Sequence, residues 1–244
     1  MSLLSILFAV LFYAATLVLV VGVARKIRIY ARTPAPLRIP TTPAPITASG
    51  VGWRMAREVV FFESLFKASK WTWIFGWSFH FGLLLVLLRH LRYFQEPVWL
   101  PVMWIQPLGT YAGFLMVFGL AGLWARRFLV DRVRYISTPS DHLMLALLLV
   151  IGASGLLMRF VVHPDIVAVK QFTLGLLTLN WQALPALPLL LLHLALVALL
   201  MLVFPISKLL HAPGLFFSPS RNQADDARET RHVAAWAAAL DKKP

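Results

Sequence analysis

Long uninterrupted apolar runs constrain the fold of this chain more than any other feature. A helix that crosses a bilayer needs roughly 20 mostly apolar residues. Five stretches of the sequence meet that requirement, at residues 3–23, 71–91, 107–124, 142–162 and 187–209. We therefore predict an all-α integral membrane protein, in which residues 1–212 form a bundle of five transmembrane helices. Residues 213–244 are polar and are expected to form a cytoplasmic tail.

The composition agrees with a membrane protein and excludes several kinds of site. Of the 244 residues, 59% are hydrophobic and 14% are charged, against about 25% charged in an average soluble protein. A net charge of +13 would suit nucleic-acid binding, but the basic residues gather between the apolar runs, which favours membrane topology instead. The chain has no cysteine, so disulfides, thiolate-bound iron–sulfur clusters and covalently attached heme are excluded within it. Metals or cofactors must be bound by His, Met or carboxylate side chains.

The first apolar run lies where a secretory signal peptide would lie. Its basic residues, Arg25 and Lys26, follow the apolar stretch instead of preceding it, and no small-residue cleavage site is evident. We interpret this run as a retained first helix.

The distribution of basic residues predicts the orientation in the membrane. With five spans, all but four of the 23 Lys and Arg residues fall on one side. The positive-inside rule then places the N-terminus outside and the C-terminus in the cytoplasm, in a bacterial inner membrane. The four exceptions are Arg89, Arg92, Arg159 and Lys170.

The segments between the spans have distinct compositions. Residues 33–50 are proline-rich and are expected to form an extended linker. Residues 51–71 alternate basic and aromatic side chains, which is typical of a helix lying at the cytoplasmic interface. Residues 171–181 are apolar but too short to cross, so we expect an interfacial cap on the outer side.

Four histidines lie on the second and fifth predicted spans. Because these spans run in opposite directions, the histidines can face each other as an inner pair, His80 with His211, and an outer pair, His90 with His193. At 100° per residue the fifth-span pair returns to about the same face, whereas the second-span pair is offset by about 80°. The rises, ~15 Å and ~27 Å for ideal helices, differ, and tilt with a kink at Pro205 would have to absorb the difference.

Opposed imidazoles inside a bilayer predict iron porphyrin bound between them. Two non-covalent b-type hemes, each with two axial histidines, would form an electron path across the membrane. Gly76 and Gly82 would let a flat macrocycle approach the backbone. Arg89 and Arg92 could pair with heme propionates or quinone oxygens, although arginines at a helix end are also ordinary snorkelling residues.

The remaining histidines and other functions give alternatives. His142 follows a helix-start signal and is expected to have a role near the N-cap, His163 competes with His193 as partner of His90, and His232 lies in the polar tail. A transporter using histidines as proton relays is a second hypothesis, against which stands the lack of a carboxylate in mid-span. A structural membrane anchor without heme is a third hypothesis.

The five-span plan, with its His-x9-His and His-x17-His spacings, resembles the gamma subunit of respiratory nitrate reductase. This resemblance covers the chain from Leu3 to about His211. The stretch ESLFKASKWTWIFGWSFHFGLLLVLLRHLRYF is most similar to the membrane cytochrome b of the sulfite-reductase-associated transmembrane complex. It is also similar to the membrane subunits of heterodisulfide-reductase-like complexes.

The resemblance implies a diheme cytochrome b that exchanges electrons with a membrane quinone such as menaquinone. His90 and His193 would hold the outer heme, and His80 and His211 the inner one. The expected partners are a cytoplasmic iron–sulfur subunit and further membrane and periplasmic subunits, within dissimilatory sulfur metabolism. The chain would be an electron-transfer subunit and not a complete enzyme by itself.

One region departs from the nitrate-reductase pattern. That family has a glycine before the outer histidine of the second span and a nearby lysine that helps to bind quinol, whereas Arg89 precedes His90 here. Glu96 is the titratable group of the following loop. We expect the quinone site near His90, Arg89, Arg92 and Glu96.

Overall fold

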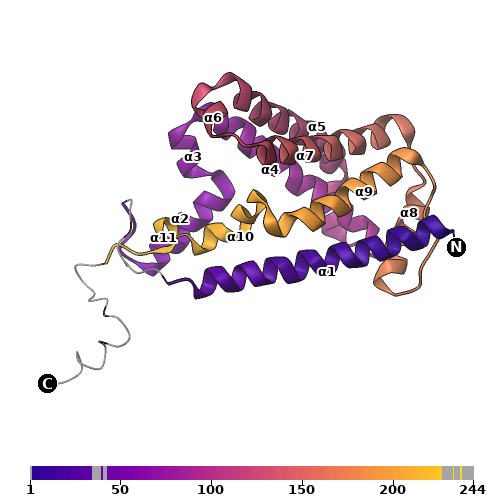
Figure 1. The fold of residues 1–244 in the computed structure, drawn as a ribbon, viewed down its shortest axis with the longest axis horizontal. Coiled ribbons are helices and arrows are strands. Elements are labelled where there is room, and N and C mark those ends of the chain that lie inside the picture. The colour runs from indigo at the N-terminus through magenta and orange to yellow at the C-terminus, as the bar shows by residue number, and fades with distance from the viewer. Residues whose placement is uncertain (1, 35–39, 41–42, 227–232, 234–236, 238–244) are drawn as a thin grey trace.

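The computed structural model describes residues 2–34, 40, 43–226, 233 and 237. Parts of the predicted linker at 33–50, half of the predicted tail at 213–244, and His232 lie outside the described residues. Within the described residues the chain is helical and contains no strand (Figure 1). The predicted all-α fold is confirmed.

In the part of the chain that the structure describes, five helices are long and apolar enough to cross a membrane, as the sequence predicts, and the protein is a multi-pass membrane protein. Three of them continue into a short turn of tighter or wider helix before they end. The five are α1 (Leu3–Arg32), α4 (Lys70–His90, continued by Leu91–Tyr93), α5 (Leu100–Leu129), α7 (Pro139–Leu157, continued by Met158–Val162) and α9 (Pro188–Val203, continued by Phe204–Ile206).

Two spans are longer than predicted. α1 and α5 each have 30 residues, a length of about 45 Å that covers a bilayer with its headgroup regions. The predicted start of the third span at Pro107 is wrong, because α5 begins at Leu100 and Pro107 lies inside it. Proline lacks the N–H that an interior helical position donates to the carbonyl four residues earlier, and α5 continues through Pro107 without this bond.

Short helices surround the ends of the spans. The predicted interfacial helix at 51–71 is divided into α2 (Ala48–Phe61) and α3 (Glu63–Ala68), because Phe62 adopts a left-handed conformation with φ 52°. The predicted outer cap at 171–181 corresponds to α8 (Ile166–Leu177), which begins earlier than predicted. The remaining short α-helices are α6 (Asp131–Ile136), α10 (His211–Gly214) and α11 (Pro219–Asn222).

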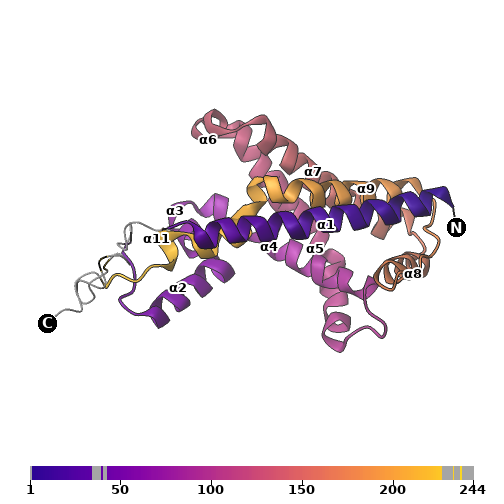
Figure 2. The same ribbon diagram turned by 60° about the horizontal axis from the view of Figure 1, so that its bottom comes forward.

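The spans pack against one another in pairs along the bundle. α4 packs closely on α5, and α1 runs beside α9 along the length of the molecule (Figures 1 and 2). Glycine permits the closest approach: a Cβ on Gly119 of α5 would lie 2.5 Å from the carbonyl oxygen of Phe75 and the amide nitrogen of Phe79 on α4. Small residues at helix interfaces are typical of membrane bundles, where backbones pack directly on each other.

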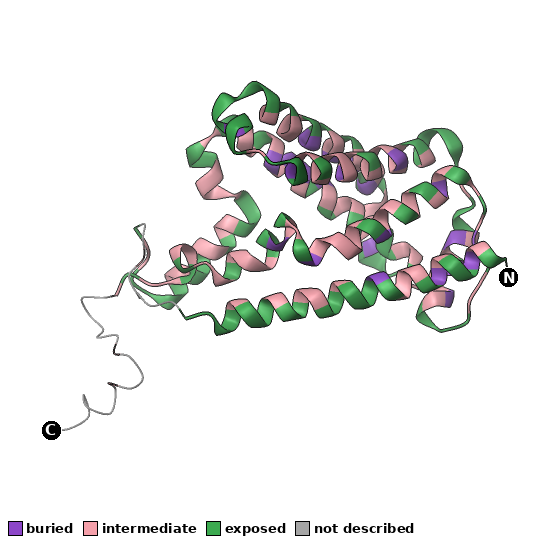
Figure 3. Ribbon diagram, viewed as in Figure 1, coloured by how far each residue is buried: buried purple, intermediate pink, exposed green. Residues whose placement is uncertain are grey.

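The spans are buried along narrow stripes and exposed elsewhere (Figure 3). One apolar cluster, built from Phe79, Met116, Leu120 and Leu148, joins α4, α5 and α7. Large apolar side chains such as Leu7 and Phe118 are more than half exposed, as expected for faces that contact lipid.

The polar elements separate between the two ends of the bundle. α2, α3, α6, α10 and α11 gather at one end, whereas the N-terminus and α8 lie at the other (Figure 1). This separation matches the two groups of loops assigned from the basic residues. Which end faces the cytoplasm stays a prediction.

Candidate functional site

The two rings of the inner histidine pair lie close together and nearly perpendicular to each other. His80 projects from the middle of α4, and His211 is the first residue of α10. Their ring centroids are 5.9 Å apart and the ring planes meet at 85°. Two imidazoles bound on opposite sides of one metal, at metal–nitrogen bonds of about 2 Å, also have centroids about 6 Å apart. The spacing of the inner pair therefore fits one metal ion between the rings.

The outer pair comes from α4 and α9. His90 is the last residue of α4, and His193 lies in the second turn of α9. A Cβ on Gly155 of α7 would lie 3.6 Å from Cε1 of His193, so the ring packs directly against the α7 backbone.

Each of the four histidines uses its Nδ1 atom in a hydrogen bond to an oxygen atom. A metal-bound histidine typically donates its other ring N–H to such an oxygen, which fixes the tautomer and turns the Nε2 lone pair toward the metal. The partners are the carbonyls of Gly76 for His80 (2.8 Å), Val86 for His90 (2.6 Å) and Lys208 for His211 (2.9 Å), and the hydroxyl of Ser154 for His193 (2.9 Å).

The tautomer of His193 follows from the partner of Ser154. The Ser154 hydroxyl donates its one hydrogen to the carbonyl of Ile151 at 2.9 Å. Its oxygen must therefore accept the hydrogen bond from Nδ1–H of His193. Nε2 of His193 is left as an unprotonated donor atom for a metal.

His142 and His163 are placed differently. His142 follows the capping box that Thr138 and Asp141 form at the start of α7, and its Nδ1 accepts a hydrogen bond from Nε1–H of Trp124 at 3.1 Å. Neutral His142 therefore carries its proton on Nε2. His163 is exposed beyond the end of α7. His193 stays the predicted partner of His90.

A large cavity opens beside the inner pair. Its volume is about 1780 Å³, and its wall includes His80, His211 and aliphatic side chains of α7 and α9. Lys26, Arg127 and Lys208 also line it. An apolar wall with a few basic side chains suits a flat apolar ligand that carries carboxylates.

Two arginines and a glutamine form a polar cluster beside the outer pair. Nε of Arg89 and Nη1 of Arg92 both donate to Oε1 of Gln106 on α5, at 3.4 and 3.2 Å. Gln106 accepts from both guanidinium groups without neutralising either, so both keep their positive charge for an anion. Glu96 forms an ion pair with Lys170 of α8.

The donor set fits a metal that brings its own additional ligands. No group of three or more His, Asp or Glu side chains that could hold a metal ion occurs in the described part of the chain. Each pair supplies two nitrogens, whereas protein-only zinc sites use three or four ligands. A porphyrin supplies four nitrogens in its plane and needs two axial ligands, which is the number that each pair presents.

Comparison with known proteins identifies the family. A model of the nitrate reductase gamma subunit family matches residues 50–221, which include all four histidines. The chain belongs to this family. It is also similar to two archaeal proteins, each named Hdr-like menaquinol oxidoreductase cytochrome b-like subunit. The protein from Archaeoglobus fulgidus is 36% identical over 92% of this chain and 81% of its own length. The protein from Archaeoglobus profundus is 34% identical over 94% of this chain and 82% of its own length.

The structure corrects one expectation about glycines in this family member. Gly82 does not face a cofactor space: a Cβ there would lie 2.7 Å from the amide nitrogen of Met116, so Gly82 packs against α5. A Cβ on Gly76 would meet Leu65 of α3 at 3.4 Å, and the contribution of Gly76 is the carbonyl that orients His80.

The prediction that one continuous helix brings His193 and His211 to the same face is also wrong. α9 ends at Val203, and a turn through Pro205 is followed by Ser207 in an extended conformation. Proline removes a helical N–H, so the helix does not continue. A break, and not a continuous helix, precedes His211 where it meets His80.

Sequence reasoning missed Ser154, Gln106 and the residues around Asp141. A serine or glutamine within an apolar run is a signal, because polar side chains in membrane helices need partners. Which partner each takes depends on helix rotation, which one sequence does not determine.

Proposed function

We propose that this chain is a diheme b-type cytochrome that carries electrons between a membrane quinone and a cytoplasmic iron–sulfur subunit. The observation that carries the proposal is the common orientation of His80, His90, His193 and His211. Each holds its Nδ1 on an oxygen atom, and they form an inner pair from α4 and α10 and an outer pair from α4 and α9. Heme held by two histidines supplies one-electron transfer and has no open position for oxygen.

The chain's own residues supply orientation and charge. Carbonyls and the Ser154 hydroxyl fix the imidazoles, while Lys26 and Arg127 at the inner end and Arg89 and Arg92 at the outer end offer cations for propionates. Aliphatic side chains of α7 and α9 line the inner cavity, and the apolar surroundings of a heme are one of the properties that set its potential.

Menaquinone is the proposed quinone. The names of both archaeal relatives include menaquinol oxidoreductase. We place the quinone site near His90, Arg89, Arg92 and Glu96, where cationic donors lie at the outer end of α4. The Lys170 ammonium beside Glu96 adds a titratable pair to this neighbourhood.

The proposed soluble partner is a heterodisulfide-reductase-like iron–sulfur subunit. The relatives are named Hdr-like, and the end of the bundle with α2, α6 and α11 carries most of the basic loop residues. Such a surface attracts an acidic partner. Further membrane and periplasmic subunits, and a role in dissimilatory sulfur metabolism, complete the proposal.

Reduction of the purified chain by a menaquinol analogue tests the function. Reconstituted in lipid, the chain is expected to show the absorption bands of low-spin b-type heme. Menadiol should reduce this heme within seconds in a stopped-flow experiment. His90→Ala and His193→Ala should each abolish the outer heme, and His80→Ala and His211→Ala the inner one. A folded but colourless protein would refute the proposal and favour a transporter or a structural anchor.

A further inference from the structure

The segment that carries His211 is not part of a regular helix. α9 ends at Val203, and the chain then passes through two short turns separated by Ser207, which is extended at φ −102° and ψ 172°. His80, in contrast, lies inside the long helix α4. The spacing of the inner pair therefore depends on whatever fixes residues 204–211.

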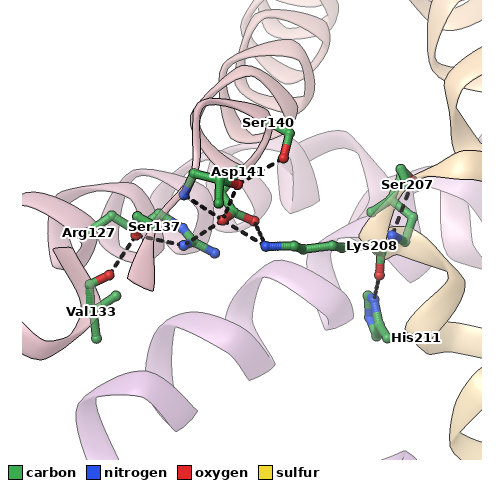
Figure 4. A network of polar contacts seen from close by, with 10 residues as sticks. Arg127, Val133, Ser137, Ser140, Asp141, Ser207, Lys208 and His211 are labelled. Carbon is green, nitrogen blue, oxygen red and sulfur yellow. Dashed lines mark hydrogen bonds and ion pairs between the residues drawn. The ribbon is translucent and has the colours of Figure 1, made fainter. Parts of the chain in front are cut away.

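A cross-helix ion pair fixes this segment. Nζ of Lys208 lies 2.6 Å from Oδ1 and 2.8 Å from Oδ2 of Asp141, at the start of α7 (Figure 4). The Asp141 side chain is 3% exposed, and it also accepts hydrogen bonds from the Thr138 amide at 3.0 Å and the Thr138 hydroxyl at 2.9 Å. Arg127 lies 3.6 Å away. Asp141 is thus a rigid, buried anchor for a lysine whose own side chain is 71% exposed.

The same lysine orients the histidine through its backbone. Nδ1–H of His211 donates to the carbonyl oxygen of Lys208 at 2.9 Å. One residue therefore joins Asp141 through its side chain and His211 through its carbonyl, and Figure 4 shows this chain of contacts. The orientation of the imidazole depends on where that carbonyl is held.

We propose that Asp141 is a positioning residue for the inner heme, acting through Lys208 on His211. The proposal rests on the proposed function, because it presumes that the inner pair binds heme iron. A positioning role differs from a purely electrostatic one: breaking the tether from either side must have the same effect, because both breaks release residues 204–211.

The test compares four single variants and one double variant of the full chain in detergent. Asp141→Asn keeps an acceptor for Thr138 but removes the ion pair, and Lys208→Met removes the ammonium but keeps the carbonyl. Lys208→Arg retains a cation as the conservative rescue. Lys67→Met is the matched control, because Lys67 is also 71% exposed and also pairs with a carboxylate, Glu63, at 2.6 Å. The readouts are heme release to apomyoglobin and the low-spin electron paramagnetic resonance signal of each iron.

Asp141→Asn and Lys208→Met are both expected to release the inner heme about tenfold faster, the lower end of the effect of losing a partner of a metal-bound histidine. Both should shift the inner low-spin signal in the same direction, since that signal depends on the 85° angle between the imidazole planes. The double variant Asp141→Asn/Lys208→Met should release the inner heme at the same rate as either of its single variants. Lys208→Arg and Lys67→Met should behave like the wild type. The outer heme should not change in any variant.

Other outcomes overturn the inference. Midpoint potentials that shift in opposite directions for the two charge changes, with unchanged resonance signals, would mean that the charges act only through their field. Wild-type behaviour of Lys208→Met would also refute the tether, and because that side chain is exposed, this variant remains informative if Asp141→Asn fails to fold. A wild-type chain without heme would refute the proposed function instead.

Discussion

Replacing Ser154 with alanine tests the orientation of a ligand at the outer pair. Among the four Nδ1 partners, the Ser154 hydroxyl is the one that belongs to a side chain, and the other three are backbone carbonyls. Ser154→Ala therefore removes one orienting contact without touching any ligand. Ser154 is 3% exposed, so water does not readily replace the lost hydroxyl.

The expected cost can be worked out in two ways. A buried donor left without its acceptor costs about 1–3 kcal/mol, and Nδ1–H of His193 is such a donor in the variant. Loss of a hydrogen-bond partner of a metal-bound histidine lowers metal affinity by about 10–100-fold, which corresponds to about 1.4–2.7 kcal/mol. The two ranges agree, so the outer heme should bind about 10–100-fold more weakly while the inner heme keeps its affinity.

Heme titration followed by optical and resonance spectra provides the assay. The variant should fill the inner site at wild-type heme concentrations and the outer site only at higher ones. The outer midpoint potential should also rise, because a histidine that loses this hydrogen bond is a weaker electron donor. Ser78→Ala, at a buried serine of α4, is the control and should leave both sites unchanged. Equal affinity of both sites in Ser154→Ala would refute the assigned tautomer of His193.

Three further predictions concern other parts of the chain. His142→Ala should retain both hemes in a pyridine hemochrome assay, because the His142 Nδ1 is an acceptor in a protein hydrogen bond. Gly119→Ala should lower stability by about 1–2 kcal/mol, seen as earlier aggregation on heating, because its Cβ would meet the α4 backbone at 2.5 Å and alanine's helix propensity offsets only part of the strain. Gly52→Ala, where nothing lies within 4 Å of the added Cβ, should leave stability unchanged. Arg221→Ala removes a 3.0 Å ion pair to Glu58, a side chain that is 10% exposed, and should speed proteinase K cleavage near α11 by about 5–30-fold, as expected for a loss of one or two kcal/mol; unchanged cleavage would contradict a role of this pair in holding α11.

The sequence predicts the spans well because crossing a bilayer imposes a minimum apolar length on each helix. That rule does not set where a helix ends in the interface, so α1 and α5 run past their predicted limits. Pro107 illustrates the reason: proline often starts a helix, but membrane helices also tolerate it in their interior, and α5 continues through it.

The candidate site divides in the same way. The four histidines stand out because imidazole is rare in lipid, and their antiparallel order along two spans predicts the pairs. The break at Ser207 and the tether from Lys208 to Asp141 could not be predicted, because they depend on how residues far apart in sequence meet. Asp141 has the sequence pattern of a capping residue, and the pattern gives no sign of its second partner.

The heme content of the purified wild-type chain tests the central claim most directly. A pyridine hemochrome assay, with protein measured by amino-acid analysis, should give two b-type hemes per chain, and each single alanine variant of His80, His90, His193 or His211 should give one. A folded wild-type protein with no heme, or variants that keep both hemes, would contradict the assignment of the two histidine pairs as axial ligands.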